Sequence, residues 1–277
     1  LYVVATPIGN ITDISIRALY ALQLADAIAC EDTRHSKPLL AQYGISKPLM
    51  AVHDHNEAEA ATGLIERLRN GDRIALITDA GTPAISDPGA RVVAAAHRAG
   101  IRVIPIAGAS AAVAAMSAAG LDGGFQFIGF LPSKSVARAQ TLQALGKAQT
   151  SLIFYEAPHR LHDTIAAMAD IYPTRSLTIA KELSKLHEHV FTLPLEQANA
   201  WLYDAPAPRG EYVLILSAPT VEASSDTPAW HETLTTLLEE LPLKQAVALT
   251  VKLTAAQKNE VYAQALHLKN QKDTSHP

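Results

Sequence analysis

The chain has 277 residues, of which 48% are hydrophobic and 18% are charged, a composition that excludes an extensively disordered protein. Its 23 basic and 27 acidic residues leave a net charge of −4, which excludes a protein that coats nucleic acid nonspecifically. The single cysteine, Cys30, excludes an intrachain disulfide, a thiolate zinc cage and a Cys-x-x-Cys redox pair, and it favours a reducing compartment.

Residues 1–119 alternate short apolar runs with longer amphipathic stretches. They predict strands at 1–5, 27–30, 74–78 and 103–106, and helices near 15–24, 58–69 and 92–99. This alternation predicts a mostly parallel sheet with helices on both faces. Three of the strands lead into loops that contain glycine or proline: TPIGN at 6–10, DAGTPAISDPG at 79–89 and AGAS at 107–110. Because ligands of such sheets bind beyond the carboxyl ends of the strands, we expect these loops to form the rim of a site.

A second α/β domain is predicted over residues 120–217, after a flexible joint around 119–124. Its expected strands are 126–130, 151–155, 177–180, 189–192 and 211–217, with helices near 137–145 and 161–169. Residues 218–229 are rich in Ser, Thr and Pro and predict a linker. Residues 230–270 predict a small all-helical module of three helices, broken at Pro242 and near Thr254. The expected fold class is therefore α/β, with two α/β domains and a helical C-terminal module.

The segment at 79–89 is the most informative loop. Its two glycines and two prolines exclude a helix and predict a shaped loop, in which Asp79 and Ser86 offer polar contacts. One such loop alone is equally consistent with a tight connection that binds nothing, but three loops at one sheet edge favour a site. TPIGN matches neither the dinucleotide fingerprint nor the P-loop, so a dehydrogenase or kinase loses its main support.

Several motifs in order carry a resemblance to a known family. They are ATPIGN, CEDTRHSKPLL, HDHNE, TDAGTPAISDPG, IAGASA, FIGFLP, FYEAPHR, AKELSKLHE and RGEYVLIL, which together span nearly all of residues 1–217. In this order and spacing they resemble the ribosomal RNA small subunit methyltransferase I family. ELPLKQA at 240–246 resembles that family's C-terminal helix-turn-helix-like domain.

The resemblance implies an enzyme that transfers a methyl group from S-adenosylmethionine to the ribose 2'-hydroxyl of a cytidine in small-subunit (16S) rRNA. It also implies two α/β domains of the tetrapyrrole methylase type with the cofactor in the cleft between them, a homodimer, and naked rRNA or the 30S particle as substrate. The cofactor residues that it implies are Pro7, Gly9, Asp79, Gly81, Thr82, Ile85, Ser86, Ser110, Ala111, Tyr155, Leu183 and Pro206. Cys30 and Ala84 stand where that family usually has alanine and glycine, and IAGASA replaces the commoner IPGPSA, so the loss of glycine and of proline weakens the expected loop shape.

Methyl transfer from a sulfonium is an in-line displacement that needs close positioning and an acceptor for the hydroxyl proton. The matching motifs offer Glu31, Asp32, His53, His55, Glu182 and Lys185 as candidates, and the sequence does not choose among them. For the two histidines, a metal site without thiolate ligands and a solvated surface pair are the alternatives to an RNA or active-site role.

Basic residues gather in four short clusters, each of which could also be an ordinary solvated face. From them Arg34, Lys37, Lys134, His159 and Arg160 are expected to contact RNA, since phosphates need such groups. Tyr155 or Phe130 could stack on a flipped base. In the helical module, lysines are balanced by glutamates, so we expect an accessory that helps to hold a large RNA or the subunit.

Two alternatives stay open: a methylase of the same fold acting on a tetrapyrrole precursor or on a protein to make diphthine, and a nucleotide-binding regulator without catalysis. The helical module and the CEDTR and HDHNE segments favour RNA. No apolar run reaches the roughly 18 residues of a membrane span and no signal-peptide pattern opens the chain, so we expect a cytoplasmic protein. Because Leu1 already lies in a predicted strand, we expect a few native residues to precede it.

Overall fold

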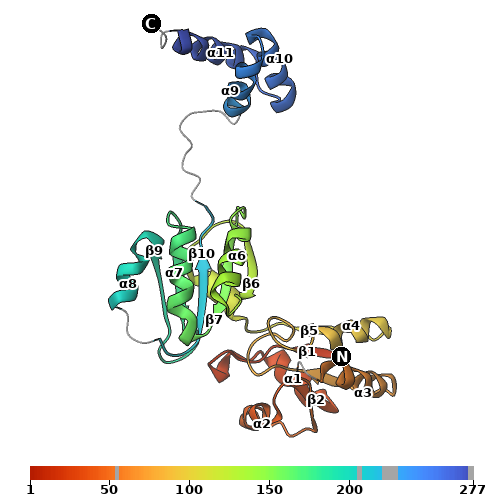
Figure 1. Ribbon diagram of the computed structural model, residues 1–277. Coiled ribbons are helices and arrows are strands. Elements are labelled where there is room, and N and C mark those ends of the chain that lie inside the picture. The colour runs from red at the N-terminus through yellow and green to blue at the C-terminus, as the bar shows by residue number, and fades with distance from the viewer. Residues whose placement is uncertain (54–55, 205–207, 220–229, 274–277) are drawn as a thin grey trace. The chain divides into compact units, whose positions relative to one another are not determined.

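The computed structural model describes residues 1–53, 56–204, 208–219 and 230–273. The chain folds into two compact units, residues 1–220 and residues 221–277. The first contains two five-stranded sheets and the second contains three helices (Figure 1). Two residues predicted to act in the site, His55 and Pro206, lie outside the described residues, as does most of the predicted linker at 218–229.

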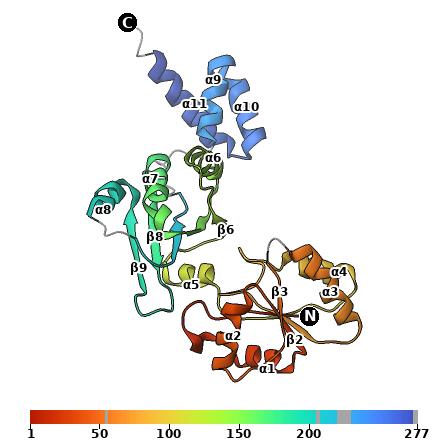
Figure 2. The ribbon, with the colours of Figure 1, turned by 60° about the horizontal axis from the view of Figure 1, so that its bottom comes forward.

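The first sheet is parallel throughout, as predicted. Its strands are β1 (Tyr2–Val4), β2 (Ala27–Cys30), β3 (Leu49–Ala51), β4 (Ile74–Leu76) and β5 (Ile104–Ile106), in the order β3-β2-β4-β1-β5. The helices around it are α1 (Ile16–Leu24), α2 (Thr33–Gln42), α3 (Glu57–Arg69) and α4 (Ala90–Arg98). Helices α1 and α2 contribute to one core cluster, and α3 and α4 to another on the opposite face (Figure 2). Because both faces are covered, the strands are short and apolar rather than alternating.

The second sheet is mixed. Its strands are β6 (Phe125–Phe130), β7 (Ser151–Glu156), β8 (Ser176–Lys181), β9 (His189–Pro194) and β10 (Tyr212–Leu216), in the order β6-β7-β10-β8-β9. Strand β10 runs antiparallel to both β7 and β8, while β6 and β7 are parallel. The start of β10 therefore lies at the same edge of the sheet as the carboxyl ends of β6, β7 and β8.

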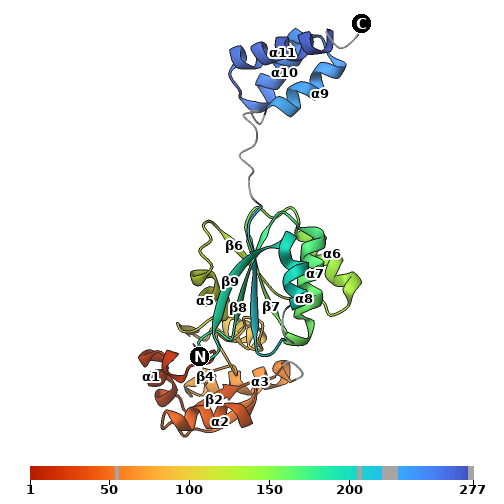
Figure 3. The ribbon, with the colours of Figure 1, turned by 90° about the vertical axis from the view of Figure 1, so that its left-hand side faces the viewer.

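Helices cover both faces of this second sheet (Figure 3). One face carries α6 (Ser135–Leu145), α7 (Leu161–Ile171) and α8 (Ala198–Asp204), which share a core with Leu152, Phe154 and Leu214. The other face carries α5 (Ala111–Ala118), which packs on Ile153, Val213 and Ile215. Since α5 follows directly from the loop after β5, it connects the first sheet to the second. The division of this unit after residue 119 stays a prediction.

The C-terminal unit consists of α9 (His231–Glu240), α10 (Leu243–Thr254) and α11 (Lys258–Asp273). Its core contains Leu234, Ala246, Val247, Val261 and Ala265. Pro242 precedes α10, and Ala255, with φ of 55°, ends it, so the two predicted breaks are confirmed. In the described part of the chain, no helix has the length and apolar character needed to cross a membrane.

Candidate functional site

The three loops at the carboxyl edge of the first sheet are tied together by hydrogen bonds. After β1, the Thr6 backbone N donates to the carbonyl of Gly81 at 2.9 Å, and the Gly81 N donates back to Thr6 at 3.1 Å. The Thr6 hydroxyl also donates to the carbonyl of Thr78 at 3.0 Å. The loop after β5 joins them, because the Thr82 hydroxyl donates to the carbonyl of Ala109 at 2.9 Å. The loops thus meet at one place, as the sequence predicts.

The loop at 79–89 holds two non-glycine residues in the left-handed region. Ala84 has φ of 67° and Ser86 has φ of 66°. Ala84 therefore adopts the conformation that glycine favours, at a cost of roughly 1–2 kcal/mol. A bulge in β6 places Gly129 against this loop, where an added Cβ would lie 3.2 Å from the Ser86 hydroxyl oxygen. Contacts from the rest of the fold therefore hold the loop in its strained shape.

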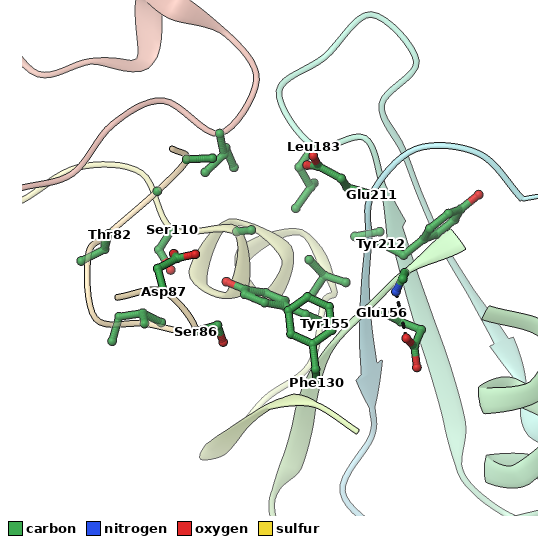
Figure 4. A pocket seen from close by; sticks show the side chains of 18 of the residues that line it. Thr82, Ser86, Asp87, Ser110, Phe130, Tyr155, Glu156, Leu183, Glu211 and Tyr212 are labelled. Atoms are coloured by element: carbon green, nitrogen blue, oxygen red, sulfur yellow. Dashed lines mark hydrogen bonds between the residues drawn. The ribbon is translucent and has the colours of Figure 1, made fainter. Parts of the chain in front are cut away.

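A cavity of about 360 Å³ opens between these loops and the second sheet (Figure 4). This volume lies in the range of roughly 300–1,000 Å³ typical of small-molecule sites. The first sheet's side lines it with Ile8, Ala80, Gly81, Thr82, Ile85, Ser86, Asp87, Ser110 and Ala111. The second sheet's edge contributes Phe130, Tyr155, Glu156, Ala157, Pro158, Ala180, Leu183, Glu211, Tyr212 and Val213. Asp87 and Ser110 lie on one side of the space, and Glu211 and Leu183 lie on the other.

Tyr155 forms an aromatic wall of the cavity. Its hydroxyl oxygen accepts a hydrogen bond from the backbone N of Ala112, in the first turn of α5, at 3.2 Å. Burial raises the pKa of Tyr155 and the charge of Asp87 raises it further, so the phenol stays neutral. Phe127 and Phe130 pack edge-on against its ring, with centroid distances of 4.9 Å and 5.7 Å. Phe130 is 56% exposed and presents a free aromatic surface beside the cavity.

Glu156 supports the cavity wall from within the fold. Its carboxylate is buried and accepts hydrogen bonds from the Ala157 N at 2.8 Å and from the Thr164 hydroxyl at 2.6 Å. Arg160 Nε lies 3.2 Å from the same carboxylate, and another of its nitrogens donates to the carbonyl of Leu131 at 2.5 Å. The guanidinium of Arg160, predicted to contact RNA, is therefore engaged in holding the ends of β6 and β7 together.

A charged cluster lies at the rim of the cavity. Lys185 Nζ is 3.0 Å from Glu182 Oε1 and 3.0 Å from Glu211 Oε2. Burial lowers the pKa of Lys185, but the hydrogen bonds to both carboxylates outweigh this and leave it above its ordinary value. A Cβ added at Gly9 would lie 2.5 Å from Lys185 Cγ and 2.9 Å from the carbonyl oxygen of Leu183, so only glycine permits this close approach. Gly9 therefore lets the loop after β1 contact the segment after β8.

Glu31 and Asp32 are not among the residues that line the cavity. The Thr78 hydroxyl donates to Glu31 Oε2 at 2.9 Å, and the Asp32 N donates to Asp79 Oδ1 at 3.4 Å. Asp32 caps α2 by accepting from the Arg34 N at 2.8 Å. The Arg34 guanidinium beside it lowers the pKa of Asp32 to about 2. The Glu31 carboxylate and the Asp32 backbone N–H thus support the start of the 79–89 loop.

The remaining predicted residues lie at the surface. Arg34, Lys37, Lys134, His159 and His53 are all exposed. Lys134 and His159 follow β6 and β7, whereas Arg34 and Lys37 belong to α2. His53 follows β3, where its backbone N donates to Asn56 Oδ1 at 2.8 Å. Within the described ranges, no group of His, Cys, Asp or Glu is arranged to hold a metal ion.

Comparisons with known proteins place the chain in a family. The family model described as Tetrapyrrole (Corrin/Porphyrin) Methylases matches residues 1–199, and the RsmI C-terminal HTH domain model matches residues 224–269. Ribosomal RNA small subunit methyltransferase I of Pseudomonas aeruginosa is 48% identical over 272 residues, which cover 96% of each chain. The protein of that name from Haemophilus influenzae is 45% identical over 95% of this chain and 94% of its own. The chain belongs to the ribosomal RNA small subunit methyltransferase I family.

Solved structures agree on the fold of this family member. A uroporphyrin-III-C-methyltransferase from Thermus thermophilus superposes with a TM-score of 0.53 at 21% identity, covering 77% of this chain and 92% of its own. Diphthine synthase superposes with a TM-score of 0.56 at 19% identity, covering 78% and 88%. The predicted tetrapyrrole methylase fold is confirmed. As a member of the ribosomal RNA small subunit methyltransferase I family, the chain is a methyltransferase that uses S-adenosylmethionine.

The cavity of this methyltransferase fits such a cofactor. Gly81, Ala111 and Ala180 are small enough for a ligand to approach the backbone closely, and Ile85 and Leu183 provide apolar surface. Three lining residues, Asp87, Glu156 and Glu211, are acidic, and no lysine or arginine is among the lining residues. This charge suits a ligand that carries a sulfonium and an ammonium group.

The structure brings together most of the predicted cofactor residues of this family member. Eight of the predicted residues line the cavity: Gly81, Thr82, Ile85, Ser86, Ser110, Ala111, Tyr155 and Leu183. Pro7, Gly9 and Asp79 lie in the same loops, next to lining residues. Among the lining residues that sequence reasoning missed are Ile8, Asp87 and Glu211. All three stand inside motifs that the sequence analysis names, but assigning Glu211 to the site also requires knowledge of the direction of β10.

Proposed function

We propose that this chain methylates the ribose 2'-hydroxyl of a cytidine in small-subunit (16S) rRNA, with S-adenosylmethionine bound in the cavity between the two sheets. The observation that carries the proposal is the convergence of the loops after β1, β4 and β5 on a cavity of about 360 Å³ that the second sheet closes. The names of relatives with 41–48% identity support RNA as the substrate. The bound cofactor supplies an activated methyl group.

The protein's own part in this reaction is to bind and orient. The loop at 79–89 and the start of α5 form one wall, and Tyr155 and Leu183 form the other. The hydrogen bonds between Thr6 and Gly81 fix the loops before any ligand arrives. With the cofactor bound, such preorganisation would help to hold the ribose oxygen in line with the methyl group, and alignment of this kind can supply roughly 7–11 kcal/mol of a barrier.

We infer that Glu211 accepts the proton of the ribose hydroxyl. As the oxygen forms its bond to the methyl carbon and the bond from that carbon to sulfur breaks, the hydroxyl proton must leave. Glu211 lines the cavity and its side chain is 75% exposed, whereas Glu182 is largely covered and hydrogen-bonded to the Glu211 N at 2.9 Å. Lys185 remains protonated because its pKa is raised, so it positions Glu211 and does not act as the base.

The RNA is proposed to approach along the edge of the second sheet. Phe130 offers an exposed ring beside the cavity on which a flipped base can stack. Lys134 and His159 follow the strands at this edge and are exposed, which supports the proposal that they contact phosphates. In the part of the chain that contains the first sheet, Arg34 and Lys37 on α2 are proposed to contact phosphates.

We further propose a cytoplasmic homodimer. Two large apolar side chains on α1, Ile16 and Tyr20, are 86% and 64% exposed and lie one helical turn apart. Leu186, in the segment after β8, is 94% exposed. Exposed apolar side chains in such number support a protein interface in this unit.

One assay tests the proposed reaction. The protein is incubated with S-adenosylmethionine labelled in the methyl group and with isolated small subunits, naked rRNA or a tetrapyrrole precursor, and the label is mapped. We expect label on one cytidine ribose and on no other substrate class. Label in the tetrapyrrole, or cofactor binding without transfer to either RNA substrate, would refute the proposal.

A further inference from the structure

Glu57, the last residue of the HDHNE motif, has a buried carboxylate that the proposed reaction does not use. It is the first residue of α3 and only 5% exposed. Its Oε1 accepts hydrogen bonds from the backbone N of Gly89 at 2.9 Å and from the N of Arg91 at 2.8 Å. Its Oε2 lies 3.9 Å from Arg91 Nε. All of these contacts are with the start of α4, more than 30 residues further along the chain.

Helix α4 needs such a partner because its own sequence provides none. The residue at its N-cap position is Gly89, with φ of 132° and no side chain that could accept a hydrogen bond. The first backbone N–H groups of a helix have no partner within the helix, and the positive end of the helix dipole favours a negative charge. Glu57 satisfies two of these groups and supplies that charge, so it acts as an N-cap from another helix.

The capped position is also the end of the loop that lines the cavity. Gly89 closes the 79–89 segment, and within it the Ala84 N donates to the carbonyl of Pro88 at 3.3 Å. A Cβ at Gly89 would lie 3.1 Å from a methyl carbon of Leu76 in β4, so the backbone there has little room to shift. The left-handed residues Ala84 and Ser86 lie between this fixed end and the anchor at Gly81.

We infer that Glu57 is a positioning residue for cofactor binding: by capping α4 it fixes the end of the loop at 79–89 and thereby the shape of the cavity wall. This inference rests on the proposal that the cofactor binds in that cavity. Loss of the cap allows the strained segment to relax, so the binding-competent shape becomes one of several and the apparent affinity falls.

The test compares Glu57→Ala with Glu57→Gln and with Glu59→Ala, an exposed glutamate in the same first turn of α3. We expect E57A to raise the Kd for S-adenosylmethionine by about 10-fold in calorimetry well below its Tm, the effect of losing a cap. We expect the KM for the cofactor to rise likewise while kcat at saturating cofactor is unchanged. E57Q keeps an oxygen that accepts from both N–H groups and should recover most of the affinity, and E59A should match the wild type.

Two results would overturn the inference: an E57A protein with lowered Tm but unchanged cofactor Kd, or an E57Q protein as impaired in binding as E57A. If E57A does not fold, the test uses Glu57→Asp, whose side chain is one methylene shorter. The same rise in the Kd for S-adenosylmethionine is then expected. A Gly81→Val variant separates this inference from the proposed site. If G81V still binds the cofactor with wild-type affinity, the cavity is not the cofactor site. If G81V loses this affinity while E57A keeps it, only the role of Glu57 is rejected.

Discussion

Phe130 is the residue whose environment most directly points to the substrate. Its ring is held edge-on by Tyr155 at a centroid distance of 5.7 Å, yet more than half of the side chain is exposed at the rim of the cavity. Replacing Phe130 with Ala should raise the KM for the RNA substrate by roughly 5- to 150-fold, because a base stacked on an aromatic ring contributes about 1–3 kcal/mol. The cofactor Kd should change less than about 2-fold, well under 1 kcal/mol. Steady-state kinetics and calorimetry measure the two effects.

Phe130→Tyr and Phe130→Leu are the matched controls, since the first keeps the aromatic face and the second keeps only bulk. Tyrosine should restore the KM and leucine should not. Equal KM values for the leucine and tyrosine variants would show that no base stacks on the ring. A large rise in the cofactor Kd would show that Phe130 packs against the cofactor instead.

Lys185 gives a pH dependence with a defined sign. Its pKa is raised in the fold, so its contribution to stability is present below the unfolded value of about 10.4 and is lost as pH rises through the folded value. Glu182 is the opposite case: burial raises its pKa, but the Glu211 N–H and Lys185 lower it more, so its contribution is lost as pH falls through the folded value. Both contributions are therefore present together around neutral pH.

Lys185→Met should accordingly lower Tm by a constant amount between about pH 6 and pH 9. The free energy of unfolding should fall by on the order of 1 kcal/mol or less, because Glu211 is exposed to solvent. The difference from the wild type should shrink toward pH 11 and toward pH 4. Thermal unfolding monitored by circular dichroism across this range measures it. A difference that keeps its neutral-pH size at both extremes would mean that packing of the lysine stem, and not its charge, is responsible.

At the scale of elements, the first sheet was predictable because its periodicity is local. Every strand expected from an apolar run is present, and the Gly- and Pro-containing loops lie where the carboxyl-edge rule for parallel sheets places them. Sequence reasoning missed β3 and the helices α2, α5 and α8. Strand β3, with the sequence LMA, contains no β-branched residue, α2 contains Pro38, and five of the eight residues of α5 are alanine, so that helix shows no amphipathic pattern.

The second half of the site was less predictable for a topological reason. Glu211 precedes a strand, and the carboxyl-edge rule directs attention to residues that follow strands. Only because β10 runs antiparallel between β7 and β8 does Glu211, just before its first residue, reach the edge of the sheet from which Tyr155 and Leu183 line the cavity. No local pattern in RGEYVLIL encodes that direction, which follows from strand pairing far along the chain.

Helix α5 is the element that joins the two halves of the site. Its first turn lines the cavity through Ala111, and its Ala112 N–H donates to the Tyr155 hydroxyl. Tyr155→Phe removes that acceptor and leaves the N–H unpaired, which costs about 1–3 kcal/mol and should weaken cofactor binding roughly 5- to 150-fold. Calorimetry at neutral pH checks this. Wild-type affinity in Y155F would show that α5 is placed by its packing on Ile153 and Val213 alone.

At the scale of the whole molecule, the cavity and the C-terminal helices belong to different units. All residues that line the cavity fall within residues 1–220, a compact unit with its own cores, whereas α9, α10 and α11 share a separate core. Cofactor binding in the first unit and the proposed substrate contact of the second can therefore be tested separately. The RsmI C-terminal HTH domain model matches residues 224–269, which include most of this second unit, and we propose that the unit contacts RNA or the subunit.

A protein that ends at residue 219 should consequently keep its cofactor Kd within about 2-fold, because no contact of the cavity is removed. Its KM for small subunits should rise at least about 10-fold, since substrate contacts made by a linked second module are lost. Restoring residues 220–277 as a separate polypeptide should not recover the KM, because the effective concentration given by the linkage is absent. An unchanged KM in the shortened protein would assign the helical unit a role other than substrate binding, and a lost cofactor affinity would show that the two units depend on each other for folding.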